Sequence, residues 1–225
     1  MYFCIVQNSV IYYYQDMEES RHIELNKAKW NKWSKSADGK GVLYEYLRSA
    51  QLSVISMAGI KENINFLDIG CGTGWAVGEA AKAADYKGSF FGVDLSEGMI
   101  GKAKEKFSNH VNLYFIQGNS ESIPLESSFF DVIICTNSFH HYLHPSSAMQ
   151  EISRILKPGG KIYILDPAAD SWFIKIIDKI IKIFEPQHVK IYSSEEFKRF
   201  MLEAGLKYNG YKLIERKQKV QVGEK

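Results

Sequence analysis

The sequence predicts an α/β fold in which a parallel sheet is covered by helices on both faces. From about residue 63 onward, short apolar runs alternate with segments of helical pattern, which is typical of consecutive βαβ units. The run at 130–135 is continuously apolar apart from Asp131, as expected for a strand buried on both faces. A chain of 225 residues is long enough for one well-buried core with a small lid.

Five strands and three helices follow one another in this part of the chain. The first strand ends in a glycine-rich turn, and Ser96 is the expected N-cap of the second helix. The third helix is expected to end before Pro158-Gly159-Gly160, because these residues disfavour a helix. The expected strands are 65–69, 89–94, 111–116, 130–135 and 161–165, and the expected helices are 75–84, 96–107 and 146–156.

Further segments flank this alternation. Residues 1–60 hold aromatic and amphipathic pieces that end in a helix-like stretch at 42–57, and we expect an N-terminal helical and aromatic lid there. Residues 61–225 form the expected main domain, with a cap insertion at about 168–192. Two more helices are expected between residues 170 and 204. The chain then closes on two strand-like pieces, near 206–214 and 217–222.

Charge and cysteine content narrow the function. The 28 basic and 26 acidic residues give a net charge of +2, so no concentrated basic face for a nucleic acid is expected. The three cysteines lie far apart without Cys-x-x-Cys or Cys/His ligand spacing, which argues against a metal site and favours the reducing cytoplasm. Neither a signal-peptide pattern nor an apolar stretch of about eighteen residues is found, so no transmembrane segment is expected.

The turn after the first strand reads Gly70-Cys71-Gly72-Thr73-Gly74. Glycines at the end of a strand let the backbone turn tightly and approach a ligand, while the following helix offers unpaired N–H groups. The spacing is G-x-G-x-G, whereas a dinucleotide fingerprint needs G-x-G-x-x-G and would place glycine at Trp75. The phosphate-loop pattern is also missing. A plain tight turn without a ligand is the alternative.

Asp94 ends the second strand, beside the glycine turn if the two strands are adjacent and parallel. A carboxylate there can accept hydrogen bonds from both hydroxyls of a ribose. Leu95 can then pack an apolar face against an adenine. The alternative is that Asp94 supports the start of the helix near Ser96.

Five segments in sequence order resemble one family. They are LDIGCGTG, GVDLSEGMI, FFDVIICTNSFHHYLHP, ILKPGGKIYILDP and YSSEEFKRFMLEAGL. The set is similar to class I S-adenosylmethionine-dependent methyltransferases of type 11, the group that includes quinone-biosynthesis C-methyltransferases. It covers about residues 64–214. The resemblance implies a Rossmann-like, seven-stranded, mostly parallel sheet of order 3-2-1-4-5-7-6, with the seventh strand antiparallel, helices on both faces and a helical cap.

The resemblance also implies which residues hold S-adenosyl-L-methionine and its product, S-adenosyl-L-homocysteine. The methionine part would face Asp68 and the turn, with Thr136 and Asn137 near the reacting sulfur. The ribose would be held by Asp94, and the adenine by Leu95. Asn119 and Ser120 match the pair that reaches the adenine edge, although the family usually has aspartate at 119. The implied turn residues are Gly70, Cys71, Gly72 and Gly74.

A methyl acceptor that must lose a proton needs a base. Candidates are His140, His141 and His188, and we take His141 as the candidate catalytic residue, with a packing role for the His140–His141 pair as the alternative. His188 can line the pocket from the cap or serve in a turn.

Residues 172–184 contain a narrow charged stripe in an otherwise apolar segment. Lys175, Asp178, Lys179 and Lys182 recur at helical spacing. Four interpretations are open: a lid over an apolar substrate pocket, a subunit contact in a homodimer, a membrane-surface helix, or core packing. The resembling family places its substrate-binding insertion here, which favours the lid.

These observations predict a methyltransferase acting on a small, apolar or aromatic molecule. Residues 30–36 resemble the family's N-terminal lid segment, but Ala37 stands where a tyrosine often follows. No Asn-Pro-Pro-aromatic motif follows the fourth strand, which argues against a protein or nucleic-acid substrate. The rival functions are a nicotinamide-dependent reductase and a catalytically silent, cofactor-binding partner subunit.

Overall fold

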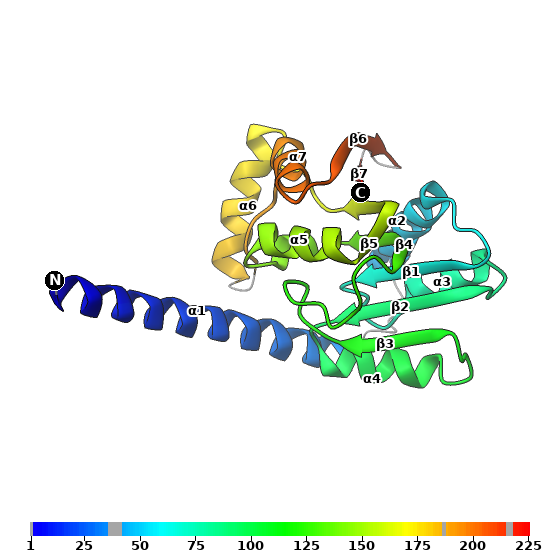
Figure 1. Cartoon of the computed structure of the whole chain (residues 1–225), viewed down its shortest axis with the longest axis horizontal. Coiled ribbons are helices and arrows are strands. Elements are labelled where there is room, and N and C mark those ends of the chain that lie inside the picture. Colours follow the sequence, from blue (N-terminus) through cyan, green and yellow to red (C-terminus); the bar gives the residue numbers. More distant parts are fainter. Residues whose placement is uncertain (1, 36–41, 186–187, 215–217) are drawn as a thin grey trace.

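The protein is a twisted sheet with helices on both faces and one long helix that extends from the body (Figure 1). The computed structural model describes residues 2–35, 42–185, 188–214 and 218–225. In these residues the sheet has seven strands in the order β3-β2-β1-β4-β5-β7-β6, which confirms the predicted fold class. The strands are β1 Ile64–Ile69, β2 Gly88–Asp94, β3 Leu113–Gln117, β4 Phe130–Thr136, β5 Leu156–Leu165, β6 Lys207–Leu213 and β7 Lys219–Glu224.

Strands β1 to β5 pair in parallel, and β7 runs antiparallel to both β5 and β6. The parallel register brings Ile69 beside Val93 and Cys135, so three strands end at the same edge of the sheet. The helices are α1 Tyr2–Ser34, α2 Val42–Ala58, α3 Trp75–Ala83, α4 Glu97–Lys106, the 3-10 turn η1 Phe139–His141, α5 Pro145–Ile155, α6 Trp172–Phe184 and α7 Ser194–Glu203.

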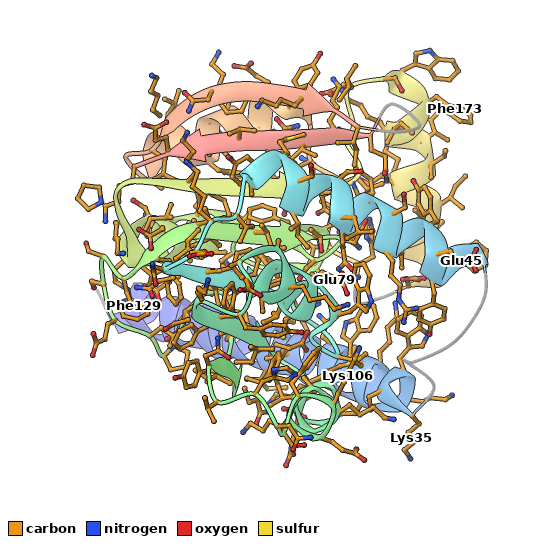
Figure 2. All side chains as sticks on the ribbon, turned by 90° about the vertical axis from the view of Figure 1, so that its right-hand side faces the viewer. Lys35, Glu45, Glu79, Lys106, Phe129 and Phe173 are labelled. Atoms are coloured by element: carbon orange, nitrogen blue, oxygen red, sulfur yellow. The ribbon has the colours of Figure 1, made fainter. Side chains whose placement is uncertain are left out.

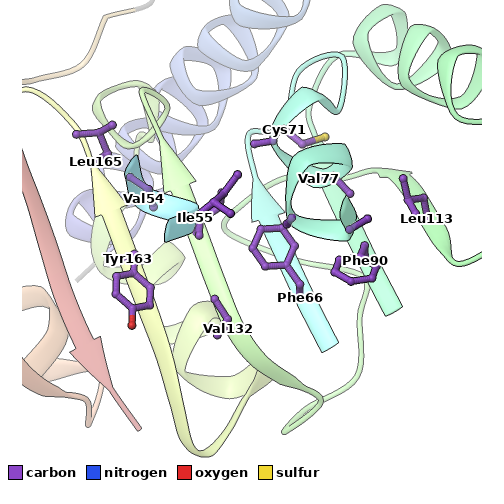
Figure 3. Close-up of a cluster of buried hydrophobic side chains, with 14 of the residues drawn as sticks. Val54, Ile55, Phe66, Cys71, Val77, Phe90, Leu113, Val132, Tyr163 and Leu165 are labelled. Carbon is purple, nitrogen blue, oxygen red and sulfur yellow. The ribbon is translucent and has the colours of Figure 1, made fainter. Parts of the chain in front are cut away.

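The core has two layers because successive strand residues point to opposite faces. Phe66 of β1 packs with α2, α3 and α4 in one cluster, part of which Figure 3 shows. The next residue, Leu67, packs with α5 and α7 in the other cluster. Each face of the sheet is therefore covered by helices, and the strands read as apolar runs.

Two helix starts follow the local sequence. Ser96 Oγ accepts a hydrogen bond from the Met99 N–H (3.1 Å), which confirms the predicted N-cap of α4. Ser193 and Glu196 form a capping box at α7, in which each side chain bonds the other residue's backbone N–H. These caps fix where the helices leave the sheet edge.

The expected limits of two strands were wrong. Strand β3 begins at Leu113, and Val111 is exposed. Strand β5 begins at Leu156 and runs through Gly159 and Gly160, because Lys225 pairs with both glycines. The Gly159 N–H donates to the Lys225 carbonyl (2.7 Å), and the Lys225 N–H donates to the Gly160 carbonyl (3.0 Å). A breaker sequence is thus held extended by a partner from the end of the chain.

Helix α1 is a single helix of 33 residues where the sequence predicted separate pieces. Its C-terminal end docks on the start of α4, where Asn31 Oδ1 accepts hydrogen bonds from Ser96 Oγ (2.6 Å) and the Gly98 N–H (3.0 Å). Its N-terminal part projects away from the sheet (Figure 1). None of the helices in the described ranges, α1 included, is long and apolar enough to cross a bilayer.

Candidate active site

A cavity of about 520 Å³ lies at the carboxyl ends of β1, β2 and β4. Open α/β sheets bind their ligands at this edge, and the volume lies in the usual range for small-molecule sites. One side, the turn wall, is formed by residues 69–73, 93–95 and 118–121. The other side, the helix wall, is formed by α1, α2 and residues 136–144.

The glycines of the turn wall have different structural roles. Gly70 has φ +78°, and an added Cβ would lie 2.1 Å from Ser138 Oγ, so close packing requires glycine there. Gly74, which caps α3 with φ +77°, lies outside the cavity lining and would place a Cβ 2.5 Å from the Phe115 ring. Gly72 has φ +53° and open space around its Cβ direction. Gly72, which lines the cavity, therefore leaves open a space that the side chain of any other residue would occupy.

The Asp94 carboxylate accepts two backbone hydrogen bonds at the turn wall and also lines the cavity. Its Oδ2 accepts from the Gly72 N–H (2.9 Å), and its Oδ1 accepts from the Ser96 N–H (2.8 Å). Burial raises the pKa of this carboxyl group, although both N–H bonds act in the opposite direction. Asp94 thus supports the start of the helix near Ser96, the alternative considered from the sequence, and it also lines the cavity.

Asp68 lies fully buried beneath the turn wall rather than in the cavity lining. Neither of its carboxylate oxygens has a hydrogen-bond partner among the described residues. Burial, and secondarily the nearby Asp94 charge, raise the pKa of Asp68 to about 8. A buried, unpaired acid beside a cavity favours a cationic ligand, since such a group is costly to leave unmatched.

The remaining residues of the predicted cofactor site lie in the cavity lining: Cys71, Leu95, Asn119, Ser120 and Asn137. Cys71 contributes a buried thiol whose pKa burial raises well above its usual value, so it stays neutral. The Asn119 carbonyl oxygen already accepts from the Glu121 N–H (3.0 Å). Asn137 adopts φ +53° with its N–H bonded to the Leu165 carbonyl (2.7 Å), which fixes the end of β4.

His140 has a buried carboxylate partner at the edge of the cavity. Its ring Nδ1 lies 2.7 Å from Asp166 Oδ1, and its backbone N–H donates to Asp166 Oδ2 (2.7 Å). Burial lowers the pKa of His140, but the charge and hydrogen bond of Asp166 outweigh it, so the pKa is raised. This carboxylate fixes the ring orientation, and the sequence did not indicate the pair.

His141 and His188 complete a cluster of imidazoles. His141 lines the cavity edge-on to Trp30, with ring centroids 5.5 Å apart. His188 is buried, with Nε2 2.7 Å from Asp178 Oδ1. Ligand atoms of His140, His141 and His188 lie within 4.8 Å of one another, close enough for three imidazoles to approach one metal ion. The expectation that no metal binds stays a prediction.

The helix wall contains aromatic residues from the region 1–60 in which the sequence predicted an aromatic lid, although it assigned no role to the individual side chains. Trp33 stacks on Tyr44 with ring centroids 5.5 Å apart, so α1 and α2 meet over the cavity. On α2, Gln51 donates to Thr136 Oγ1 (3.0 Å) and joins this wall to the end of β4. Tyr44, Arg48 and Gln51 share one face of the predicted 42–57 helix, a spacing that could have indicated them. Ala37 lies outside the described residues.

Helix α6 does not supply the lid surface that its sequence suggested. None of its residues 172–184, all of them described, lines the cavity, although Glu185 directly after it does. None of them is buried either, so the core-packing interpretation does not hold. Phe173 stands at the outer surface of the molecule (Figure 2).

Sequence comparisons indicate a methyltransferase domain. Residues 67–164 match a family described as a methyltransferase domain. The chain is 31% identical over 114 residues to the demethylmenaquinone methyltransferase of Staphylococcus aureus (strain MRSA252), covering 50% of this chain and 47% of that protein. It is 31% identical over 123 residues to a 37.1 kDa protein in transposon TN4556 of Streptomyces fradiae, covering 55% of this chain and 36% of that protein. The chain spans about half or less of the length of these curated relatives.

Solved structures share the fold at low identity. One is a methyltransferase in complex with the Haloferax volcanii Trm112 methyltransferase activator, with a TM-score of 0.75, 20% identity, and coverage of 87% of this chain and 96% of that chain. Another is a SAM-dependent methyltransferase from Aquifex aeolicus, with a TM-score of 0.64, 23% identity, and coverage of 77% and 88%.

The strand order, with a glycine turn and an acidic residue at the ends of its first two strands, defines a methyltransferase-type α/β fold. The matched methyltransferase domain at residues 67–164 extends from β1 to β5 of this fold.

Proposed function

We propose that this protein transfers a methyl group from S-adenosylmethionine to a small, largely apolar or aromatic molecule. The observation that carries the proposal is the contrast between the two cavity walls. The turn wall offers backbone and carboxylates to a polar, cationic cofactor, whereas the helix wall offers aromatic rings to an acceptor.

The turn wall and the residues next to it fit the cofactor. Asp68 is a buried acid with no hydrogen-bond partner among the described residues, and S-adenosylmethionine brings positive charge on its ammonium and sulfonium groups. Gly72 keeps open the space that a side chain would fill. We infer that Asp94 and Leu95 hold the nucleoside, with Asn119 and Ser120 at its base edge and Gly70, Cys71 and Asn137 along the methionine part. Gly74 supports the turn by packing on Phe115.

When bound, S-adenosylmethionine supplies a methyl group that its sulfonium makes electrophilic. The chain then has to hold the acceptor atom in line with the bond between sulfur and the methyl group, and it has to exclude water. Such positioning can by itself supply a large part of a rate enhancement. Trp30, Trp33 and Tyr44 form a rigid apolar surface suited to that task. Asn26 lines the same wall, and its buried carbonyl oxygen has no hydrogen-bond partner among the described residues, so it is a candidate to accept a hydrogen bond from the substrate and orient it.

For an acceptor that must lose a proton, we propose His140 as the base and Asp166 as the residue that positions it. With Nδ1 committed to Asp166, Nε2 remains as the ring atom that can take the proton. His141, the candidate from the sequence, lines the same wall and stays a prediction for pocket shape and for catalysis.

The fold and family give no support to a nicotinamide-dependent reductase, whose fingerprint needs glycine where Trp75 stands. A catalytically silent partner subunit would keep the turn wall but would not need the His140–Asp166 pair. The cytoplasmic location and the homodimer considered from the sequence stay predictions.

The proposal is tested by thermal melting with S-adenosylmethionine, S-adenosylhomocysteine and NAD. A ligand at a hundred times its dissociation constant stabilises a protein by about 2.7 kcal/mol. We expect the first two compounds to raise the melting temperature and NAD to leave it unchanged. A shift with NAD alone would contradict the proposed function.

A further inference from the structure

Helix α6 carries an apolar face that no described part of the chain covers. Trp172 is 74% exposed, Ile183 74% and Phe184 80%, and the intervening Ile176 and Ile180 are about half exposed. Isolated exposed apolar residues are ordinary, but a contiguous face with aromatic residues at both ends marks an interaction surface. We call the face formed by residues 172, 173, 176, 180, 183 and 184 the α6 face.

The opposite side of the helix fixes this orientation. Asp178 Oδ1 accepts a hydrogen bond from the Ile191 N–H (2.7 Å) and lies 2.7 Å from His188 Nε2. Ser171 Oγ caps the first turn through the Ile174 N–H. Ile174, Ile177 and Ile181 share the half-buried side with Asp178. Turning the α6 face inward would break these bonds, so the hydrogen bonds of the opposite side keep the α6 face exposed.

The charges around the α6 face have one sign. Lys175, Lys179 and Lys182 are exposed along one flank, while Asp178, the single acid of this fully described helix, points inward. Two neighbouring acids are already paired, since Glu185 accepts from Lys29 (2.7 Å) and Asp170 accepts from Lys219. The α6 face is therefore apolar with a cationic border.

We propose that α6 docks this protein on an anionic lipid surface, with the α6 face in the headgroup–acyl boundary. An amphipathic helix with Trp and Phe on its apolar face and Lys on its polar face has the composition of an interfacial membrane helix. Each lysine near an anionic bilayer adds a favourable contribution. A second copy of the chain fits less well, because an antiparallel two-fold contact through this helix would bring the two lysine rows together without an intervening acid.

Docking in this way brings to the lipid a helix whose last residue adjoins the cavity lining. Phe184 ends α6, and the next residue, Glu185, lines the cavity. An apolar acceptor held in the bilayer would then reach the helix wall without crossing water. This second step rests on the proposed function, whereas the lipid docking does not.

The test is sedimentation of the full chain with vesicles, in the absence of any cofactor. We expect binding to vesicles of phosphatidylcholine and phosphatidylserine in equal parts, and much weaker binding to phosphatidylcholine alone or in high salt. Ile183→Asp should reduce partitioning at least tenfold, and Lys179→Gln about fivefold. The matched control is Leu202→Asp, which places the same charge at an apolar residue of α7 that is 55% exposed. It should bind like the parent chain.

All three substituted side chains are exposed, so the melting temperature should change little in each variant. Equal binding by the parent chain and Ile183→Asp, or no binding to either kind of vesicle, would overturn the proposal. A dimer seen by light scattering that Ile183→Asp dissolves, without vesicle binding, would assign the α6 face to a second copy. The stabilisation by S-adenosylmethionine is measured in solution, so it reports on the proposed function independently of these results.

Discussion

The turn wall and the helix wall of the cavity are built in different ways. The turn wall comes from short segments at the ends of β1, β2 and β3; its lining includes Gly70 and Gly72, and Asp94 holds the Gly72 N–H. The helix wall joins α1 and α2 to residues 136–144, and its lining includes residues with large side chains such as Trp30, Trp33 and Tyr44. Backbone geometry can recognise a constant cofactor, whereas side chains can be exchanged to suit a particular acceptor. The two walls should therefore respond to mutation differently.

The largest expected effect is on turnover, through the helix wall. His140→Gln removes the proposed base, so kcat should fall by about 10²- to 10⁴-fold for an acceptor that must lose a proton. Stabilisation by S-adenosylmethionine should persist, because the turn wall is untouched. The comparison variant is His141→Gln. A larger loss of kcat in His141→Gln than in His140→Gln would return the catalytic role to His141.

The positioning role of Asp166 has its own signature. The Asp166 carboxylate raises the pKa of His140, so Asp166→Asn should lower that pKa. A base is active when deprotonated, and the acid limb of the kcat/KM profile should therefore move to lower pH in Asp166→Asn. An acid limb that stays in place, with activity merely reduced, would indicate a structural role only.

The next effect concerns cofactor affinity, through the turn wall. Asp94→Ala should weaken S-adenosylmethionine binding by at least about 10- to 100-fold, since even one hydrogen bond to a charged group contributes about 1.5–3 kcal/mol. It should also lower stability, because the Gly72 and Ser96 N–H groups lose their acceptor. Isothermal titration calorimetry measures the affinity.

Asp131→Ala is the matched control for Asp94. Asp131 likewise accepts a backbone hydrogen bond, from Asn65 (2.9 Å), and pairs with Lys157 (2.8 Å), but it lies outside the cavity lining. Its loss should cost stability and leave the affinity unchanged. Equal affinities in the two variants would remove Asp94 from the cofactor site.

A smaller effect is expected at Gly72. Gly72→Ala and Gly59→Ala both place a Cβ in open space at positive φ, so each should cost about 1–2 kcal/mol of stability. Only Gly72 lines the cavity. Gly72→Ala should therefore weaken cofactor binding about tenfold, while Gly59→Ala binds normally. Paired calorimetry and melting of the two variants would show whether this space is used.

The smallest expected effect is the number of protons released when the cofactor binds. Because Asp68 has a pKa of about 8, it is protonated at pH 7, and a cationic ligand should displace close to one proton on binding. Calorimetry in buffers of different ionisation enthalpy measures this number, which should approach zero above pH 9 or in Asp68→Asn. Proton release by Asp68→Asn equal to that of the parent chain would assign it to another group.

The Asp68 carboxyl group should also make the stability of the cofactor-free protein depend on pH. Its folded pKa lies above its ordinary value of 3.8, so the folded protein binds more protons than the unfolded chain between pH 4 and 8. Its contribution to the free energy of unfolding is therefore present at low pH and is lost as the pH rises toward 8. Asp68→Asn should flatten this part of the stability profile.

The sequence by itself determined the sheet, its order through the family resemblance, and the α4 cap. Strands such as β1 and β4 are buried on both faces, so their apolar runs are read directly, and a cap such as Ser96 acts within one helical turn. The glycine turn was readable for the same reason, since its backbone geometry is encoded by neighbours in the chain.

Tertiary structure decided what depended on distant partners. Lys225 extends β5 through a predicted breaker, and Asp166 finds His140 across 26 residues of sequence. Helix α1 continues as one helix, although its sequence has no repeating apolar stripe that would have predicted this. Its C-terminal end docks on α4 through hydrogen bonds of Asn31. The periodicity of residues 172–184 predicted an amphipathic helix, but whether its apolar arc faced a cavity or the outside depended on the Asp178 contacts. Periodicity measures how apolar a face is, and only packing decides which surface it meets.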